Sequence, residues 1–127
     1  MKSTQTDKAP LPGGHYSQAM VHNGLVYVSG QLPIDPQTGE KQTGAIEEQT
    51  RLVLQNLSAI LDASGSSLKQ VLKVTVYISD ISLWGKVNEV YAEIFDDHRP
   101  ARAIVPTRDL HFGFKIEVDA VAAVRGA

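Results

Sequence analysis

"VLKVTVYIS", residues 71–79, is the stretch that decides the fold. Apolar side chains alternate with more polar ones along it, and this period of two predicts a β-strand that buries one face. The apolar set comprises Leu72, Val74, Val76 and Ile78, and the other set comprises Lys73, Thr75, Tyr77 and Ser79. A strand of this kind needs a second layer over its apolar face, and the neighbouring segments are suited to supply it.

Two helices are predicted on either side of this strand. Residues 46–64 carry apolar side chains at the helical period, with glutamates in the first turn and Gly65 just beyond the end, as helix termini favour. A second helix is predicted from a cap at Asp80 or Ser82 through Phe95. The apolar stripes comprise Val53, Leu57, Ile60 and Leu61 in the first helix, and Trp84, Val87, Tyr91, Ile94 and Phe95 in the second.

The remaining strands are predicted near both ends of the chain. Residues 16–21 and 25–30 are β-prone runs joined by an Asn-Gly pair, which favours a tight hairpin. Residues 101–106 and 114–124 add two more strands. Residues 1–15 are expected to form an extended, partly mobile lead-in.

The predicted order is β-β-α-β-α-β-β, typical of a single α+β domain over residues 1–127. Both helices are expected on one face of a mixed sheet, because each needs the same apolar face to cover it. The opposite face would then carry Tyr77, Val121 and Ala123 beside charged residues, which is too apolar to be wholly solvated. We therefore expect this face to be an interface in a closed homo-oligomer.

Composition excludes several classes of function. The chain has 127 residues, a net charge of -2, no run of basic residues and no cysteine. Disulfides and thiolate chemistry are therefore excluded, and nucleic acid is disfavoured as a partner. The four histidines are far apart in sequence, so no metal site is expected. No signal peptide or membrane span is evident, and a cytoplasmic location is expected.

Two charged residues interrupt apolar strands. Arg102 lies in "RPARAIVP", residues 99–106, where it shares one face of the strand with Ile104. An arginine in this position must reach water, pair with a carboxylate of the protein or hold an external anion. Glu117 interrupts the last strand, where an unpaired carboxylate is costly, so an ion pair is its simplest explanation. Tyr16 and Ser29 have equally simple roles available, in packing and in turn geometry.

A succession of motifs covers nearly the whole chain in order. They are "APLPGGHYSQA" (9–19), "VYVSGQLPIDPQTGE" (26–40), "QTRLVLQNLSAILDASGSSLKQVLKVTVYISD" (49–80), "VNEVYAEIF" (87–95), "RPARAIV" (99–105) and "KIEVDAVA" (115–122). Together these motifs resemble the signatures of the RidA/YjgF family, also called endoribonuclease L-PSP-like.

This resemblance implies a chorismate-mutase-like protomer that assembles as a homotrimer with clefts between subunits. It also implies a hydrolase: a 2-iminobutanoate/2-iminopropanoate-type deaminase that converts enamines and imines to 2-oxo acids and ammonia without a cofactor. By the same resemblance, Arg102 would bind the substrate carboxylate and Glu117 would contact the attacking water. The other residues expected to line the cleft are Tyr16, Ser29, Gly30, Asn88 and Ile104.

Two alternatives remain open on the sequence. One is an endoribonuclease or translation inhibitor, as the older label of the family suggests. The other is a non-catalytic trimer that binds small carboxylates. The sequence also departs from the family pattern at His15, where proline is usual, and at "LHFGF" (110–114), where "LPKDV" is usual. Both departures could border the cleft and bear on which imine is the substrate.

Overall fold

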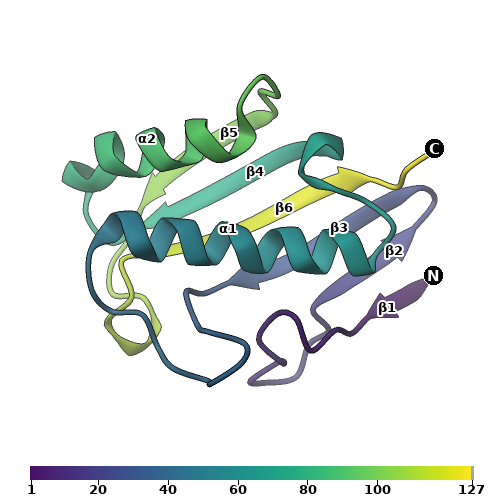
Figure 1. Cartoon of the computed structure of the whole chain (residues 1–127), viewed down its shortest axis with the longest axis horizontal. Coiled ribbons are helices and arrows are strands. Elements are labelled where there is room, and N and C mark those ends of the chain that lie inside the picture. Colours follow the sequence, from purple (N-terminus) through teal and green to yellow (C-terminus); the bar gives the residue numbers. More distant parts are fainter. Residues whose placement is uncertain (127) are drawn as a thin grey trace.

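The computed structural model describes residues 1–126 and contains a six-stranded mixed sheet with the order β1-β2-β3-β6-β4-β5. Helices α1 and α2 lie on one side of this sheet (Figure 1). The strands are β1 Lys2–Thr4, β2 Ala19–His22, β3 Leu25–Gln31, β4 Val71–Ile78, β5 Ala101–Pro106 and β6 Ile116–Ala123. The helices are α1 Ile46–Ala63 and α2 Trp84–Phe95, and short 3-10 turns are η1 Leu68–Gln70, η2 Ile81–Leu83 and η3 His111–Gly113. The predicted α+β class with two helices on one face is confirmed.

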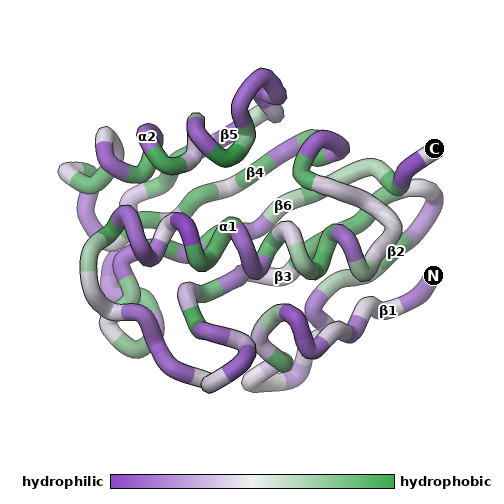
Figure 2. Tube along the Cα trace, in the orientation of Figure 1, coloured by the Kyte–Doolittle hydropathy of each residue, from purple (hydrophilic) through white to green (hydrophobic). Residues whose placement is uncertain are grey.

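The core lies between the two helices and the central pair of strands, β4 and β6. These strands are antiparallel, with Val76 opposite Val118 and Ile78 opposite Ile116, and all four side chains are fully buried. The predicted stripe of α1 packs on them, and Figure 2 shows how hydrophobic and hydrophilic residues alternate along this helix. Each such side chain contributes about 1.5–3 kcal/mol by leaving water.

The decisive strand departs from strict alternation at one residue. The pairing of β4 with β6 shifts register between Val71 and Lys73, so Val71 is buried and Leu72 is 51% exposed. An extra residue in one strand moves the preceding side chains to the other face, as in a β-bulge. The placement of Leu72 on the core face was therefore wrong, while Val74, Val76 and Ile78 lie there as predicted.

The second helix begins later than the sequence suggests. The side chain of Asp80 accepts a hydrogen bond from the Ser82 backbone N–H, but this cap closes the turn η2, and α2 itself starts at Trp84. Trp84 is 44% exposed, so it lies outside the buried stripe in which it was predicted. Val87, Tyr91 and Phe95 are buried as expected.

The lead-in is more ordered than its composition predicts. Strand β1 pairs with β2, and the buried Gln18 amide donates hydrogen bonds to the carbonyls of Thr6 and Pro10. The Thr6 backbone N–H donates to Oε1 of the same Gln18 side chain. A single buried glutamine thus satisfies backbone groups of Thr6, Ala9 and Pro10, an arrangement that no periodic pattern reveals.

The other face of the sheet is not covered by any described helix (Figure 1). Tyr27 is 48% exposed there, and Tyr77 and Val121 are partly exposed. This apolar face is the one that the sequence assigns to an interface between subunits. No helix among the described residues has both the length and the apolar character needed to cross a membrane.

The end of α1 provides a test of the fold. Gly65 has φ +78, and the N–H of Ser66 donates to the Leu61 carbonyl, which closes the helix with a left-handed residue. Gly65→Ala should lower the free energy of unfolding by about 1–2 kcal/mol, because a side chain disfavours this φ. The measurement is urea denaturation.

Gly85 provides a matched control. It lies in α2, where a Cβ would meet nothing within 4 Å. Gly85→Ala should therefore raise the free energy of unfolding by about 0.5 kcal/mol, the opposite sign. Equal effects of the two substitutions would contradict this account of the helix end.

Candidate active site

Arg102 lies on β5 and faces the helices, because it is paired with the buried Val74 of β4. Its Nη1 donates a hydrogen bond of 2.9 Å to Oδ1 of Asn88, and its guanidinium carbon lies 4.6 Å from the centre of the Tyr91 ring. The ring of Trp84 lies 6.0 Å away. Helix α2 thus brackets the guanidinium with an amide and two aromatic faces.

Neither Arg102 nor Glu117 has an ionic partner within the described part of the chain. The two ion pairs there are Arg51–Glu93 and Arg125–Asp62. The expected ion pair of Glu117 therefore has no partner among the described residues of a single chain. Arg102 likewise has no carboxylate partner within the described chain, and its N–H groups that are not bonded to Asn88 can donate to water or an external anion.

Tyr91 supports the Arg102 guanidinium with the face of its ring. Its hydroxyl is buried and lacks a hydrogen-bond partner among the described residues, and burial raises its pKa to about 12, partly offset by the nearby Arg102. The ring therefore acts as a neutral aromatic platform, which suits a cation–π contact. Asn88 and Tyr91 are three residues apart on α2, so both reach the same side.

Glu117 lies on β6 opposite Tyr77, on the face of the sheet away from the helices. Burial raises the pKa of its carboxyl, His111 lowers it in part, and Asp119 raises it further. Tyr77 donates a 3.0 Å hydrogen bond to Asp119, which leaves Glu117 as the unpaired acid of this pair of strands. A carboxylate that is partly desolvated and unpaired is a stronger base than a solvated one.

Gly30 leaves the space that the Glu117 carboxylate occupies. A Cβ at position 30 would overlap Oε2 of Glu117, so any side chain there would displace the acid. The register of β3 with β6 also shifts between Val28 and Gln31, which places Gly30 in an irregular segment of the ladder. Glycine therefore leaves room for this position of the Glu117 carboxylate, and the reason is close approach rather than a positive φ.

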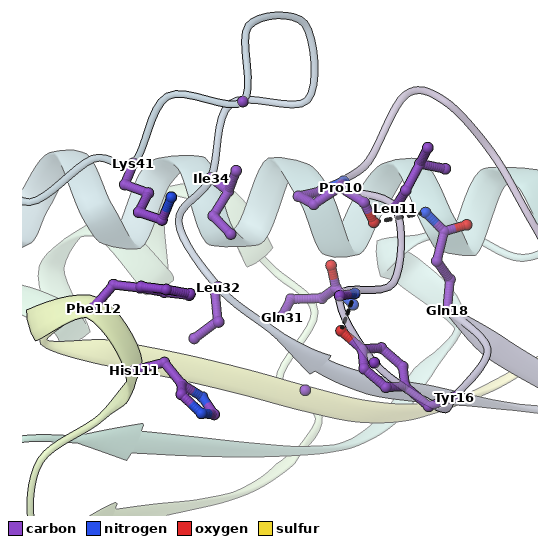
Figure 3. A pocket seen from close by; sticks show the side chains of 14 residues that line it. Pro10, Leu11, Tyr16, Gln18, Gln31, Leu32, Ile34, Lys41, His111 and Phe112 are labelled. Carbon is purple, nitrogen blue, oxygen red and sulfur yellow. Dashed lines mark hydrogen bonds between the residues drawn. The ribbon is translucent and has the colours of Figure 1, made fainter.

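Ser29 precedes Gly30 on β3, and Tyr16 lies in the segment before β2. The Ser29 hydroxyl donates a 2.6 Å hydrogen bond to the Ser17 carbonyl, so it ties β3 to the lead-in. Tyr16 is exposed, and its hydroxyl accepts a hydrogen bond from the Gly13 N–H (Figure 3). Tyr16 and Gly30 line a cavity of about 460 Å³.

The predicted site residues thus fall into two groups that do not meet within one chain. Arg102, Asn88 and Ile104 face the helices at the β5 edge, where Asn88 and Arg102 line a second cavity of about 520 Å³. Glu117 faces the opposite side of the sheet, against Gly30. The two cavities share no lining residue.

The comparisons with known proteins agree on a family. A family model described as endoribonuclease L-PSP matches residues 6–124. A RutC family protein of Pyrococcus horikoshii is 49% identical, over 92% of this chain and 93% of that protein. The 2-iminobutanoate/2-iminopropanoate deaminase of Rattus norvegicus is 40% identical, over 95% of this chain and 88% of that protein.

The chain belongs to the RidA/YjgF/L-PSP family. A solved structure of Escherichia coli TdcF with bound serine is also similar, with a TM-score of 0.92 and 37% identity over 97% of this chain and 98% of that one. That structure holds serine, a small molecule that carries a carboxylate.

Within this Rid-family chain, several residues near the predicted site were missed by sequence reasoning. Tyr91 and Trp84 were assigned to the apolar stripe of a helix, and only the spacing of Tyr91 from Asn88 signals a shared side. His111 was noted as a departure from the family pattern, and it lies close enough to Glu117 to affect its pKa. Among residues 1–126, no group of three or more side chains is arranged to hold a metal ion.

The raised pKa of Glu117 predicts a pH-dependent effect on stability. A carboxyl whose pKa is higher in the folded state binds its proton more tightly there. The contribution of this carboxyl to the free energy of unfolding is therefore full below its pKa in the unfolded chain. That contribution is lost as the pH rises through its pKa in the folded protein. Glu117→Gln, which stays neutral, should gain stability relative to the parent protein as the pH rises from about 4 to 8.

Urea unfolding across this pH range measures the difference. Glu40→Gln, on an exposed loop, controls for the change in net charge. A difference between Glu117→Gln and the parent protein that stays constant with pH would contradict the assigned desolvation.

Proposed function

We propose that this Rid-family chain is an enamine/imine deaminase that hydrolyses 2-iminopropanoate- and 2-iminobutanoate-type intermediates to 2-oxo acids and ammonia. The proposal rests on the environment of Arg102. Its guanidinium is held between Asn88 and Tyr91 and has no carboxylate partner among the described residues. The name of the rat relative supports the same chemistry.

In the proposed reaction, Arg102 binds the planar carboxylate of the imine with two parallel N–H donors. One of its nitrogens is committed to Asn88, which sets the orientation of the fork. The bound substrate thereby presents its C=N carbon in a fixed position, and positioning lowers the barrier by removing motional freedom before reaction.

Glu117 is proposed as the general base. Water bonds to the imine carbon while Glu117 accepts one of its protons, and Glu117 returns that proton to the nitrogen to give a neutral carbinolamine. Transfer of the hydroxyl proton to the nitrogen through Glu117 then forms the C=O bond, breaks the C–N bond and releases ammonia. The raised pKa of Glu117 favours proton acceptance and return within one cycle.

We further propose that the active protein is a homotrimer whose clefts combine the two groups of residues from neighbouring subunits. The separation of Arg102 from Glu117 on opposite faces of one sheet supports this arrangement. The apolar face that carries Tyr27, Tyr77 and Val121 supports it independently, because a neighbouring chain would remove that surface from water.

The role of Arg102 is tested by substitution. Arg102→Ala should lower kcat/KM for imine hydrolysis by about 100-fold or more, since two charge-assisted hydrogen bonds are lost. Arg102→Lys should recover little of the lost activity, because an ammonium cannot reproduce the two parallel N–H donors of a guanidinium. An amino-acid oxidase generates the imine, and its loss is followed with and without the protein.

Arg51→Lys is the matched control, because Arg51 forms only an exposed ion pair with Glu93. It should retain activity. Full activity of a folded Arg102→Lys protein would contradict the proposed carboxylate grip.

The shared cleft is tested by mixing two inactive variants. Arg102→Ala and Glu117→Gln each remove one half of the site, and refolding them together gives mixed oligomers. If each cleft combines two chains, roughly a quarter of the clefts regain both native residues, so activity returns to about that level. Mixed oligomers without activity would show that the two residues do not cooperate across subunits.

The same purified protein and its Arg102→Ala variant distinguish two alternative functions from the deaminase. The description of the family model favours testing RNA cleavage, although the net charge of -2 disfavours an RNA surface. Ribonuclease activity that follows the protein peak and disappears in Arg102→Ala would favour the nuclease. Carboxylate binding without imine loss would favour a non-catalytic binding protein.

A further inference from the structure

The cavity that begins at Gly30 extends well beyond the residues assigned to the reaction. Its volume is about 460 Å³, and pockets of this size bind ligands much larger than 2-iminopropanoate, whose side chain is a single methyl group. Its walls come from the lead-in, the loop after β3 and the turn η3 (Figure 3). The apolar lining side chains are Pro10, Leu11, Leu32, Ile34 and Phe112.

Phe112 forms the outer wall in an unusual backbone conformation. Its φ is 57, and its side chain is 60% exposed, although a phenylalanine is costly in the left-handed region. Its ring is held edge-on against the buried Phe114, and the Lys41 ammonium lies 4.7 Å from the ring centre. A strained, exposed and fixed aromatic ring at a cavity mouth is typical of a ligand contact.

One part of the cavity wall adjoins the proposed reacting centre, although Glu117 itself does not line the cavity. Gly30 lines it, and the Glu117 carboxylate occupies the space where a Gly30 side chain would be. His111 also lines it and is near enough to Glu117 to influence its charge. A substrate whose imine carbon lies beside Glu117 therefore has this cavity next to it.

We infer that this cavity is the subsite for the side chain of the 2-imino acid, that it selects large apolar side chains, and that Phe112 is its specificity-determining wall. The inference rests on the proposed deaminase function and names the substrate class for it. Branched aliphatic and aromatic side chains fit the lining, because each methylene that leaves water for an apolar wall adds affinity. The Lys41 ammonium lies over the Phe112 ring, and an imine with an anionic side chain tests whether it also binds anions.

The first experiment compares kcat/KM for imines made by amino-acid oxidase from alanine, leucine and glutamate. We expect the leucine-derived imine to exceed the alanine-derived one by about tenfold or more. Equal values for these two would overturn the inference. A preference for the glutamate-derived imine would also overturn it, since Lys41 would then be the determinant.

The second experiment assigns the preference to Phe112. Glycine at position 112 tolerates the φ of 57 and removes the ring. Phe112→Gly should therefore lower the ratio of kcat/KM for the leucine-derived imine to that for the alanine-derived imine about fivefold. Phe112→Tyr keeps the ring and should restore the ratio. Ile81→Ala, an exposed apolar residue of η2 outside the cavity lining, should leave the ratio unchanged. An unchanged ratio in Phe112→Gly would overturn the role of Phe112.

Binding of 2-oxo acids separates this inference from the deaminase proposal. If no imine is hydrolysed, the deaminase proposal fails, and calorimetry with 4-methyl-2-oxopentanoate and pyruvate still tests the subsite. The larger acid should bind about tenfold more tightly, and Phe112→Gly should reduce that difference. Equal Kd values for the two acids would overturn the subsite in either case.

Discussion

The antiparallel pairing of β4 with β6 is the constraint on which the rest of the structure depends. One face of this pair carries the fully buried Val74, Val76, Ile116 and Val118, and both helices pack over it. Because side chains alternate between faces from Val74 to Ile78 and along β6, burial of these residues forces Thr75, Tyr77, Glu117 and Asp119 to the other side. The hydrophobic core thus determines which face receives the acid of the candidate site.

The same alternation separates the two charged residues of the site. The parallel pairing of β5 with β4 aligns Arg102 with Val74, so the guanidinium is directed under α2. Glu117 is aligned with Tyr77 and faces away from the helices. It could reach the face of Arg102 only through a change of register that would also expose the core. The proposed cleft, which uses both residues, would therefore need a second chain, because one chain holds Arg102 and Glu117 on opposite faces of its sheet.

The sequence predicted much of the fold because its signals were periodic. The stripe of α1, the terminal strand and the Asn-Gly hairpin each repeat a local pattern, and the structure contains all three. The features that were missed depend on single contacts between distant segments. The bulge that exposes Leu72 and the hydrogen bonds from Gln18 to the lead-in are of this kind, and neither follows from local periodicity.

The candidate site could be predicted only in part for the same reason. Motifs marked Arg102 and Glu117, but the aromatic bracket of Tyr91 and the close approach of Gly30 to Glu117 arise only after folding.

Desolvation connects the proposed assembly to the proposed chemistry. Burial in the single chain already raises the pKa of Glu117, and a neighbouring subunit packed over this face would remove more water from it. In the proposed cleft, the same subunit brings its Arg102, whose charge acts in the opposite direction until a substrate carboxylate neutralises it. Substrate binding would therefore raise the basicity of Glu117 when a water molecule must be activated, and Glu117 in an isolated protomer would lack this coupling.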